Sequence, residues 1–282
     1  MRKYTIAQFN KDFPDDNACL EYLRNKYYPQ KIHCPICDKD TKFHRITTRK
    51  VYGCDNCGYQ ISPTAGTIFH KSPTSLKFWF YAIYLMTATR CGISAKQIER
   101  ETGVTYKTAW RMFNQIRSLL NDDCKASVGE FEADETYIGG KRPGKRGRGA
   151  EGKTPVFGVA QRQSEVSAVT TKDLKSATVY PLIRERALPK SMIYTDEFPV
   201  YDRLGKQGYN HERVNHGLEV YAVGKAHTNT IEGFWSLLKR GISGVYHAVS
   251  KKYLQEYVNE YVFRYNHRKD DKPMFLTVLE KI

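Results

Sequence analysis

Two pairs of cysteines constrain the fold of this chain more strongly than any other feature of its sequence. Cys34 and Cys37 form one Cys-x-x-Cys pair, and Cys54 and Cys57 form another 16 residues further on. Four thiolates at this spacing can complete a closed tetrahedral zinc site. The intervening residues 42–53 (KFHRITTRKVYG) are rich in β-branched and basic side chains and predict a hairpin. We therefore expect a zinc ribbon with a structural Zn²⁺ ion, with a redox motif or chance pairing as the alternatives.

The remaining cysteines and the N-terminal sequence indicate the compartment. Cys19, Cys91 and Cys124 lack partner spacing and are expected to be buried thiols. Seven cysteines in a reducing compartment do not form a disulfide framework. The N-terminal residues lack an apolar signal region, and no run reaches about 18 apolar residues. We therefore expect a cytoplasmic, nucleoid-associated protein with no membrane partner.

The charge balance favours a polyanionic partner. The 45 Lys and Arg residues exceed the 30 Asp and Glu residues, which gives a formal net charge of +15. The basic residues are interleaved with aromatic ones, a distribution that favours nucleic acid over a membrane surface. Many soluble proteins are also basic, so the motifs must identify the partner.

Two consecutive helices are predicted at residues 94–103 and 105–120, after an almost continuously apolar segment, 76–90, that is suited to a buried helix. Helices joined by so short a turn are typical of a helix-turn-helix, whose second helix contacts DNA through its N-terminal residues. Lys107 and Arg111 would make these contacts. A plain helical hairpin is the alternative.

The periodicity changes from helical to alternating at residue 128. Residues 128–138 predict a strand whose polar face carries Asp134. Residues 139–153 are rich in Gly, Lys and Arg and predict a loop that includes Lys141 and Arg142. This loop is either a solvated connection or an arm that grips DNA phosphates, with an affinity that falls steeply with salt.

The rest of the chain predicts two strands, a helix, a strand and two final helices. These segments are residues 155–162, 166–171, 176–187, 191–195, 226–241 and 250–268. The order predicts a mixed sheet covered by helices, in an α/β chain of the α+β multidomain kind. We expect a helical lead-in and zinc ribbon at residues 1–72, a helix-turn-helix region at 73–124 and a sheet-containing domain at 125–282.

The helix expected at residues 226–241 carries polar residues beside its apolar stripe. Glu232 and Lys239 lie seven residues apart, which places both side chains on the same side of the helix. Asn229 lies three residues before Glu232, so an Asn-x-x-Glu capping box is an alternative role for the glutamate.

Three carboxylates, Asp134, Asp196 and Glu232, fall at the ends of these elements. Like charges brought together require cations, and Mg²⁺ or Mn²⁺ takes oxygen ligands. Two such ions about 4 Å apart can activate one oxygen and stabilise the leaving oxygen of a displacement at phosphorus. Each aspartate is followed by a glutamate; strand alternation favours Asp134 over Glu135 but does not choose between Asp196 and Glu197.

Several segments of the chain together resemble the bacterial insertion-sequence transposases that combine an N-terminal zinc ribbon with a DDE catalytic domain, the ISXO2-like group. Besides the ribbon, the matching segments are GTIFHKS (66–72), ADETYIGGK (133–141), YTDEFPVYDRL (194–204), HTNTIEGFWSLLKRGI (227–242) and YVFRYNHR (261–268). The resemblance implies a ribonuclease H-like core with Asp134, Asp196 and Glu232 as the metal-binding triad. Lys239 would contact DNA near the cut. The third ligand is sometimes read as asparagine in this group, which makes Asn229 a rival or supplementary ligand. We prefer Glu232 because an anionic oxygen binds Mg²⁺ better than an amide does.

The activity implied is DNA transposition. The protein would bind the terminal inverted repeats of an element, cut a strand with metal-activated water, and join the freed 3′-hydroxyl to target DNA. The partner would be double-stranded DNA, and because both element ends are handled together, the active form would be a homodimer or larger. A transposase-derived regulator without catalysis and a metal-dependent nuclease are the alternatives.

Overall fold

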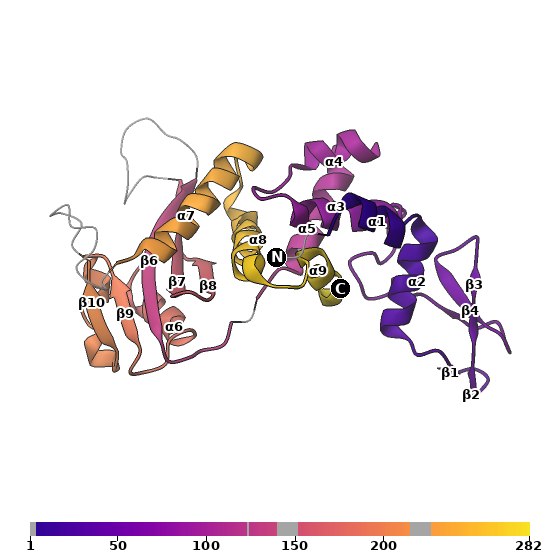
Figure 1. Cartoon of the computed structure of the whole chain (residues 1–282), viewed down its shortest axis with the longest axis horizontal. Coiled ribbons are helices and arrows are strands. Elements are labelled where there is room, and N and C mark those ends of the chain that lie inside the picture. The colour runs from indigo at the N-terminus through magenta and orange to yellow at the C-terminus, as the bar shows by residue number, and fades with distance from the viewer. Residues whose placement is uncertain (1–3, 123, 140–151, 215–226) are drawn as a thin grey trace. The chain divides into compact units, whose positions relative to one another are not determined.

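The computed structural model describes residues 4–122, 124–139, 152–214 and 227–282 (Figure 1). These residues divide into two units. The first comprises the residues up to Thr89 together with Ala95–Leu119 and Asp271–Ile282. The second comprises Arg90–Ser94 and the described part of Leu120–Asp270. The division into three domains expected from the sequence stays a prediction.

The four-cysteine region of the first unit forms two small antiparallel sheets. One consists of β1 and β2, and the other has the order β3-β4-β5. The hairpin predicted between the cysteine pairs is confirmed, because β3 and β4 pair from Phe43 opposite Cys54 to Ile46 opposite Val51. The strands are β1 (Ile32–Cys34), β2 (Lys39–Thr41), β3 (Phe43–Ile46), β4 (Val51–Cys54) and β5 (Gln60–Ile61).

Aromatic side chains pack the helices of the first unit together. The helices are α1 (Ile6–Asp12), α2 (Asp16–Tyr27), α3 (Leu76–Ala88), α4 (Ala95–Thr102), α5 (Tyr106–Ser118) and α9 (Met274–Lys281). The Phe13 ring lies 4.9 Å from that of Phe80 on α3 and 5.8 Å from that of Phe275 on α9. Lys26 Nζ also donates to the carbonyl of Leu279 at 2.8 Å. The last helix therefore belongs to the first unit, although the sequence analysis grouped it with the sheet.

The two consecutive helices predicted in this region are α4 and α5. They are joined by residues 103–105, and the Thr105 hydroxyl caps α5 by accepting from the Thr108 backbone N–H at 3.3 Å. Phe113 and Ile116 of α5 are buried. The role of this helix pair as a DNA-binding helix-turn-helix stays a prediction.

The second unit is built on a mixed sheet of the described strands in the order β10-β9-β6-β7-β8 (Figure 1). β6, β7 and β8 are antiparallel neighbours, whereas β9 runs parallel to both β6 and β10. The strands are β6 (Glu130–Gly139), β7 (Lys153–Gln161), β8 (Val166–Thr170), β9 (Met192–Thr195) and β10 (Asn210–Arg213). The mixed sheet was predicted, and β10 adds an edge strand in a segment whose short strands the sequence left undefined.

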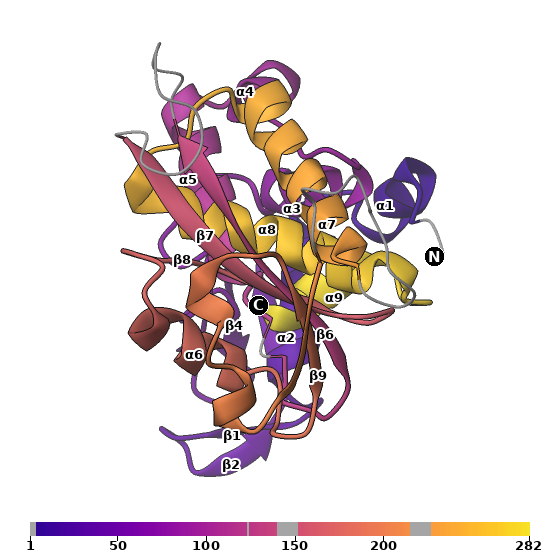
Figure 2. The ribbon, with the colours of Figure 1, turned by 90° about the vertical axis from the view of Figure 1, so that its left-hand side faces the viewer.

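Helices cover both faces of this sheet (Figure 2). They are α6 (Ser176–Arg184), α7 (Asn229–Gly241) and α8 (Leu254–Asn266). On one face, Val156 and Ala160 of β7 pack in a core with residues of α7 and α8. On the other face, Phe157 and Val159 of the same strand pack with residues of α6 and with Tyr201. β7 therefore directs alternate side chains into two separate cores, as the period of two of a strand requires.

The register of the sheet places two of the predicted acids side by side. Ala133 of β6 pairs with Thr195 of β9. The next residue along each strand is then an aspartate, Asp134 and Asp196 respectively. Asp134 lies opposite Gly158 of β7. Because β6 and β9 run parallel in this register, the two aspartates lie side by side, Asp134 within β6 and Asp196 directly after β9.

The free cysteines and the helix lengths complete the comparison with the sequence. Cys19 is buried and Cys124 is half-buried, but Cys91 is exposed, so the prediction of a buried thiol is wrong for Cys91. In the part of the chain that the structure describes, no helix has both the length and the apolarity needed to cross a bilayer.

Candidate functional site

Three carboxylates lie together in the mixed sheet, where β9 ends beside β6. Asp134, Glu135 and Asp196 each offer an oxygen that lies within 4.8 Å of the oxygens offered by the other two. Asp134 is on β6 and Asp196 directly follows β9, so the register described above brings them together. Two members of the predicted triad are therefore neighbours, and Glu135 joins them.

Hydrogen bonds hold each of these carboxylates in place. Trp235 Nε1 on α7 donates to Asp134 Oδ2 at 3.0 Å. The backbone N–H of Phe198 donates to Asp196 Oδ1 at 3.0 Å, and the hydroxyl of Tyr201 donates to Glu135 Oε2 at 2.9 Å. One donor comes from α7 and two come from the segment that follows β9, and Trp235 and Tyr201 pack on opposite faces of the sheet, so the cluster is fixed from both faces.

The cluster concentrates negative charge in a partly buried place. Burial, and then the negative charges of Glu135 and Asp196, raise the pKa of Asp134 from 3.8 to about 7, although the Trp235 hydrogen bond opposes this. Burial and the charge of Glu135 also raise the pKa of Tyr201 far above its usual value, so its hydroxyl stays a donor. Clustered carboxylate oxygens are the donor set that hard divalent cations prefer. The residues present therefore fit such a cation.

Glu232 and Lys239 lie beside this cluster. Both line a cavity of about 440 Å³ together with Asp134, Glu135 and Arg240. The Glu232 side chain is exposed, and its Oε1 accepts from the Thr228 hydroxyl at 2.6 Å. The spacing of seven residues along α7 thus places the acid and the base at the same cavity, as the helical period predicts.

Asn229 is the first residue of α7, and Thr228 is the cap residue. The alternative capping box between Asn229 and Glu232 is therefore wrong, because it requires the asparagine to precede the helix. The described residues that line the acidic cavity do not include Asn229. A supplementary role of Asn229 as a ligand stays a prediction.

Sequence reasoning missed Glu135 and the second role of Trp235. Strand alternation directs Glu135 to the face opposite Asp134, and its bond to Tyr201 agrees with that direction. Its longer side chain nevertheless offers an oxygen to the cluster. Trp235 was assigned to the apolar stripe and is 4% exposed, but its indole N–H also orients Asp134. Glu197 is exposed and is not part of the carboxylate cluster, whereas Asp196 is; the choice of Asp196 as a ligand stays a prediction.

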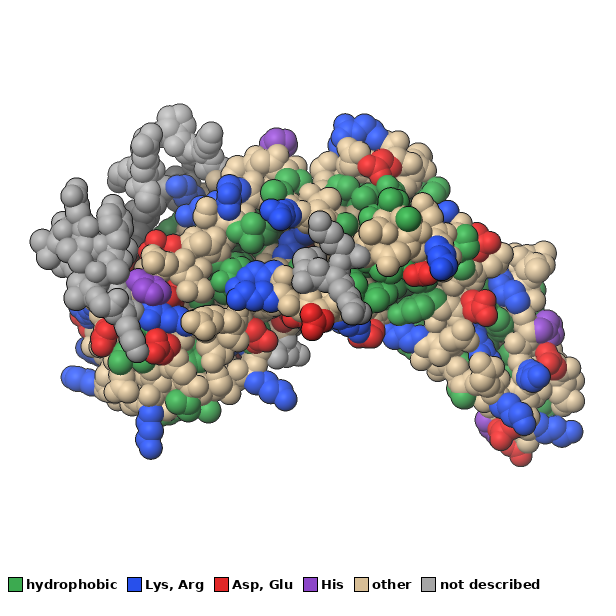
Figure 3. Space-filling view, viewed as in Figure 1, with side chains coloured by type: hydrophobic (Ala, Val, Ile, Leu, Met, Phe, Trp, Pro, Cys, Tyr) green, Lys and Arg blue, Asp and Glu red, His purple; other side chains and the backbone are tan. Residues whose placement is uncertain are grey.

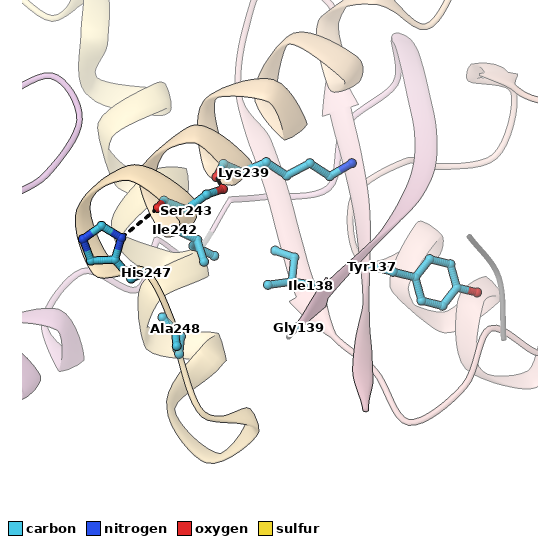
Figure 4. A pocket seen from close by; sticks show the side chains of 9 residues that line it. Tyr137, Ile138, Gly139, Lys239, Ile242, Ser243, His247 and Ala248 are labelled. Carbon is cyan, nitrogen blue, oxygen red and sulfur yellow. Dashed lines mark hydrogen bonds between the residues drawn. The ribbon is translucent and has the colours of Figure 1, made fainter. Parts of the chain in front are cut away.

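A second cavity, of about 550 Å³, adjoins Lys239 on its other side (Figure 4). Its lining includes apolar residues such as Ile138 and Ile242, and also His247, whose Nδ1 lies 3.1 Å from the Ser243 carbonyl oxygen. Figure 4 shows the Lys239 side chain extended from α7. Lys239 lines both cavities.

The four cysteines of the first unit form a separate cluster. Cys34, Cys37, Cys54 and Cys57 offer sulfurs that all lie within 4.8 Å of one another. The Cys34–Cys57 and Cys37–Cys54 sulfur distances are 3.5 and 3.8 Å. A tetrahedral Zn²⁺ ion with Zn–S bonds of about 2.3 Å requires sulfurs about 3.8 Å apart. The donor set and its spacing fit a structural zinc ion.

The predicted DNA-contacting residues are placed only in part. Lys107 and Arg111 are exposed on α5, and Arg111 Nη2 donates to the Ser72 hydroxyl at 3.2 Å. Lys141 and Arg142 lie outside the described residues. Figure 3 shows Lys and Arg side chains spread over both units among acidic ones, so the positive charge is not confined to α5.

Comparison with known proteins finds transposase domains in both units. Residues 127–266 match the ISXO2-like transposase domain, and residues 14–60 match the transposase zinc-ribbon domain. The chain is 30% identical over 292 residues to a protein in the transposable element ISH50 of Halobacterium salinarum, an alignment that covers 96% of this chain and 98% of that one. It is also 33% identical over 102 residues to a transposase-like protein of Haemophilus influenzae, covering 36% of this chain and 81% of that one.

One solved structure was also similar. It is a cryo-electron-microscopy structure of the simian T-cell lymphotropic virus intasome in complex with a phosphatase regulatory subunit. The match covers 66% of this chain and 65% of that chain at 16% identity, with a TM-score of 0.30. A likeness at this level bears on neither the fold nor the function.

Proposed function

Because this chain belongs to the ISXO2-like transposases, we propose that it binds the terminal inverted repeats of an insertion sequence, cuts the DNA strand and joins the 3′-hydroxyl end to target DNA. The observation that carries the proposal is the single cavity lined by Asp134, Glu135, Glu232, Lys239 and Arg240. Carboxylates and cations side by side suit a reaction at a phosphodiester, whose oxygens need both metal ions and basic side chains.

Acidic residues of this cavity, together with the neighbouring Asp196, would hold Mg²⁺ or Mn²⁺. Asp134, Asp196 and Glu232 are the proposed ligands, in a ribonuclease H-like arrangement. When bound, two such ions would activate the attacking oxygen and stabilise the charge that develops on the leaving oxygen. The clustering of oxygens from Asp134, Glu135 and Asp196 within 4.8 Å of one another is the observation that supports a cation here.

The other residues of the cavity would position the DNA. Lys239 and Arg240, about two turns beyond Glu232 on α7, would neutralise the phosphate at the cut. Trp235 would keep the Asp134 carboxylate in one orientation through its 3.0 Å hydrogen bond. The attacking water and, in the joining step, the 3′-hydroxyl would enter the same cavity, so that one phosphodiester replaces another without an energy-supplying nucleotide.

The first unit would recognise the element ends. We propose that α4 and α5 act as a helix-turn-helix with Lys107 and Arg111 on the DNA, beside the zinc ribbon. Lys141 and Arg142, in a Gly- and Arg-rich segment, would add phosphate contacts. Handling two ends at once implies a homodimer or larger assembly on double-stranded DNA.

Asp196→Asn tests the catalytic assignment. We expect this variant to lose strand cleavage and joining by at least about 100-fold, because it removes a charge from the cluster. It should bind DNA containing the element ends as tightly as the wild type does. The assay is strand transfer of labelled end-containing DNA with Mg²⁺, in parallel with a binding titration.

The matched control is Glu197→Gln, which neutralises the adjacent but exposed acid. It should retain activity within about threefold, a range typical of a surface substitution. Cleavage without joining in the wild type would identify a nuclease, and binding without either step would identify a regulator. An active Asp196→Asn variant would refute the assignment.

A further inference from the structure

A buried carboxylate two residues before Asp134 makes an unusually complete set of contacts. Glu132 lies on β6 and is fully buried, at 0% exposure. Its Oε2 accepts from the backbone N–H groups of Thr230 at 2.7 Å and Ile231 at 3.0 Å. Its Oε1 accepts from the Thr230 hydroxyl at 2.9 Å and from Arg162 Nε at 3.0 Å. The carboxylate thus faces the first turn of α7.

Glu132 takes the place of the cap residue at the start of α7. The first N–H groups of a helix have no partner within the helix and need an acceptor, preferably an anionic one. Thr228 is the cap residue, but its hydroxyl donates to Glu232 rather than accepting from the helix backbone. The strand therefore supplies the cap that the helix sequence does not.

Arg162 extends this contact to the residues that precede the helix. Its Nη2 donates to the His227 carbonyl at 2.7 Å, while its Nε bonds Glu132. Its guanidinium lies 3.7 Å from the centre of the Tyr194 ring on β9. Nδ1 of His227 itself lies 3.3 Å from Glu132 Oε1. Glu132 therefore contacts the first turn of α7 directly and is linked through Arg162 to His227, just before the helix.

A second tie fixes the same helix one turn later. Trp235 bonds Asp134, which is on the same face of β6 as Glu132. Gly158 of β7 leaves room for the tryptophan, because a Cβ there would lie 2.7 Å from the indole ring. Two ties from one strand to one helix fix both the position and the rotation of α7. Glu232 lies between them in sequence.

We propose that Glu132 is a positioning residue, whose buried carboxylate holds the first turn of α7 so that Glu232 stands beside the Asp134–Asp196 pair in the arrangement that binds a divalent cation. This inference rests on the function proposed above. It assigns to Glu132 no contact with DNA or cation. The inference gives two acids of β6 different roles. Asp134 would bind the cation, and Glu132 positions α7.

The test is Mn²⁺ binding to the whole protein without DNA, measured by electron paramagnetic resonance well below the unfolding temperature of every variant. Glu132→Gln should weaken Mn²⁺ binding by at least about tenfold, as loss of a residue that orients a metal ligand does. Hydrogen exchange at the Thr230 and Ile231 amides should accelerate in the same variant.

The matched control is Glu260→Gln. Glu260 is also 0% exposed and bonds Arg264 at 2.8 Å, but it lies on α8, away from the first turn of α7. The Glu260→Gln variant should lose about as much stability as Glu132→Gln does, and its Mn²⁺ affinity should stay within about twofold of that of the wild type. Should Glu132→Gln fold poorly, the double variant Glu132→Gln, Arg162→Met also removes the guanidinium, which among the described residues would retain only Glu130 as an ion-pair partner, and Mn²⁺ binding should still be weakened.

Two outcomes would overturn the inference. If Glu132→Gln binds Mn²⁺ as Glu260→Gln does, while Asp196→Asn loses binding, the cation site stands and Glu132 serves stability alone. If Asp196→Asn also binds Mn²⁺ normally, the cation site is misplaced, and the proposed function fails together with the inference.

Discussion

Asp134 shows most directly how a single residue is adapted to this site. Its carboxylate lies near two others and accepts a hydrogen bond from the Trp235 indole. Burial first, and then the charges of Glu135 and Asp196, raise its pKa to about 7. Such a group is costly for the folded chain, because its charged form is disfavoured there. Such a cost in stability is expected where a functional site is arranged to bind a cation.

The protein should therefore be more stable when this charge is removed. The folded chain holds a proton on Asp134 more tightly than the unfolded chain does, so the free energy of unfolding falls as the pH rises from about 4 to about 7. Asp134→Asn should raise the stability of the metal-free protein by about 1–4 kcal/mol at pH 8 and by much less at pH 4.

Thermal unfolding of both proteins in chelator at the two pH values measures this difference. Asn can still accept the Trp235 hydrogen bond, so the comparison isolates the charge. A variant that is less stable than the wild type at pH 8 would contradict the account.

Residue roles were predictable where spacing along one element determines them. Glu232 and Lys239 share a helix, and their period alone brings both to the cavity. Glu135 was not predictable, because alternation describes where a side chain starts and not how far it reaches. The helix-capping role of Glu132 depends on a contact across 98 residues of sequence, with Thr230, for which the sequence has no local signal.

At the scale of elements, the zinc ribbon is the part most fully specified by sequence. The cysteine spacing predicted the sulfur cluster, and the β-branched run predicted the hairpin β3–β4. The strands of the second unit were predicted to within a few residues, because alternation and buried runs identify them. The edge strand β10 was not defined, since its four residues, NHER, are polar and lack an apolar alternation.

Removal of one ribbon cysteine should unfold this element. Cys34→Ser should lose the zinc that the wild type carries, because three thiolates no longer close the site. The small sheets β1–β5 have too little core to persist without metal. The measurement is metal content by mass spectrometry, with amide hydrogen exchange of residues 32–61.

Cys91→Ser is the matched control, because Cys91 is an exposed free thiol outside the cluster. It should keep one zinc per chain and the exchange pattern of the wild type. Full zinc content in Cys34→Ser would show that the four sulfurs are not the ligands.

At the scale of the whole molecule, the chain does not follow the simple order of its domains. Residues Asp271–Ile282 return to the first unit after the sheet is complete. The domain bounds expected from the sequence place these residues with the sheet, because no helix was predicted after residue 268. Contacts such as that between Phe275 and Phe13 join residues at opposite ends of the sequence.

Phe275→Ala should therefore destabilise the first unit by about 3–5 kcal/mol, since Phe275 is 2% exposed and its removal leaves a cavity. Hydrogen exchange should accelerate in α1 to α3 and stay unchanged in β6 to β9. Leu276→Ala, at a half-buried position of the same helix, should have a smaller effect. Equal acceleration in both units would show that they unfold together.

The return of α9 also has a consequence for biosynthesis. A ribosome synthesises the chain from its N-terminus, so the strands β6 to β10 are made before the residues of α9. During that interval the aromatic side chains that later surround Phe275 are still uncovered. A chain interrupted before residue 274 would therefore contain every residue of the acidic cluster but lack the helix that covers these aromatic rings in the first unit.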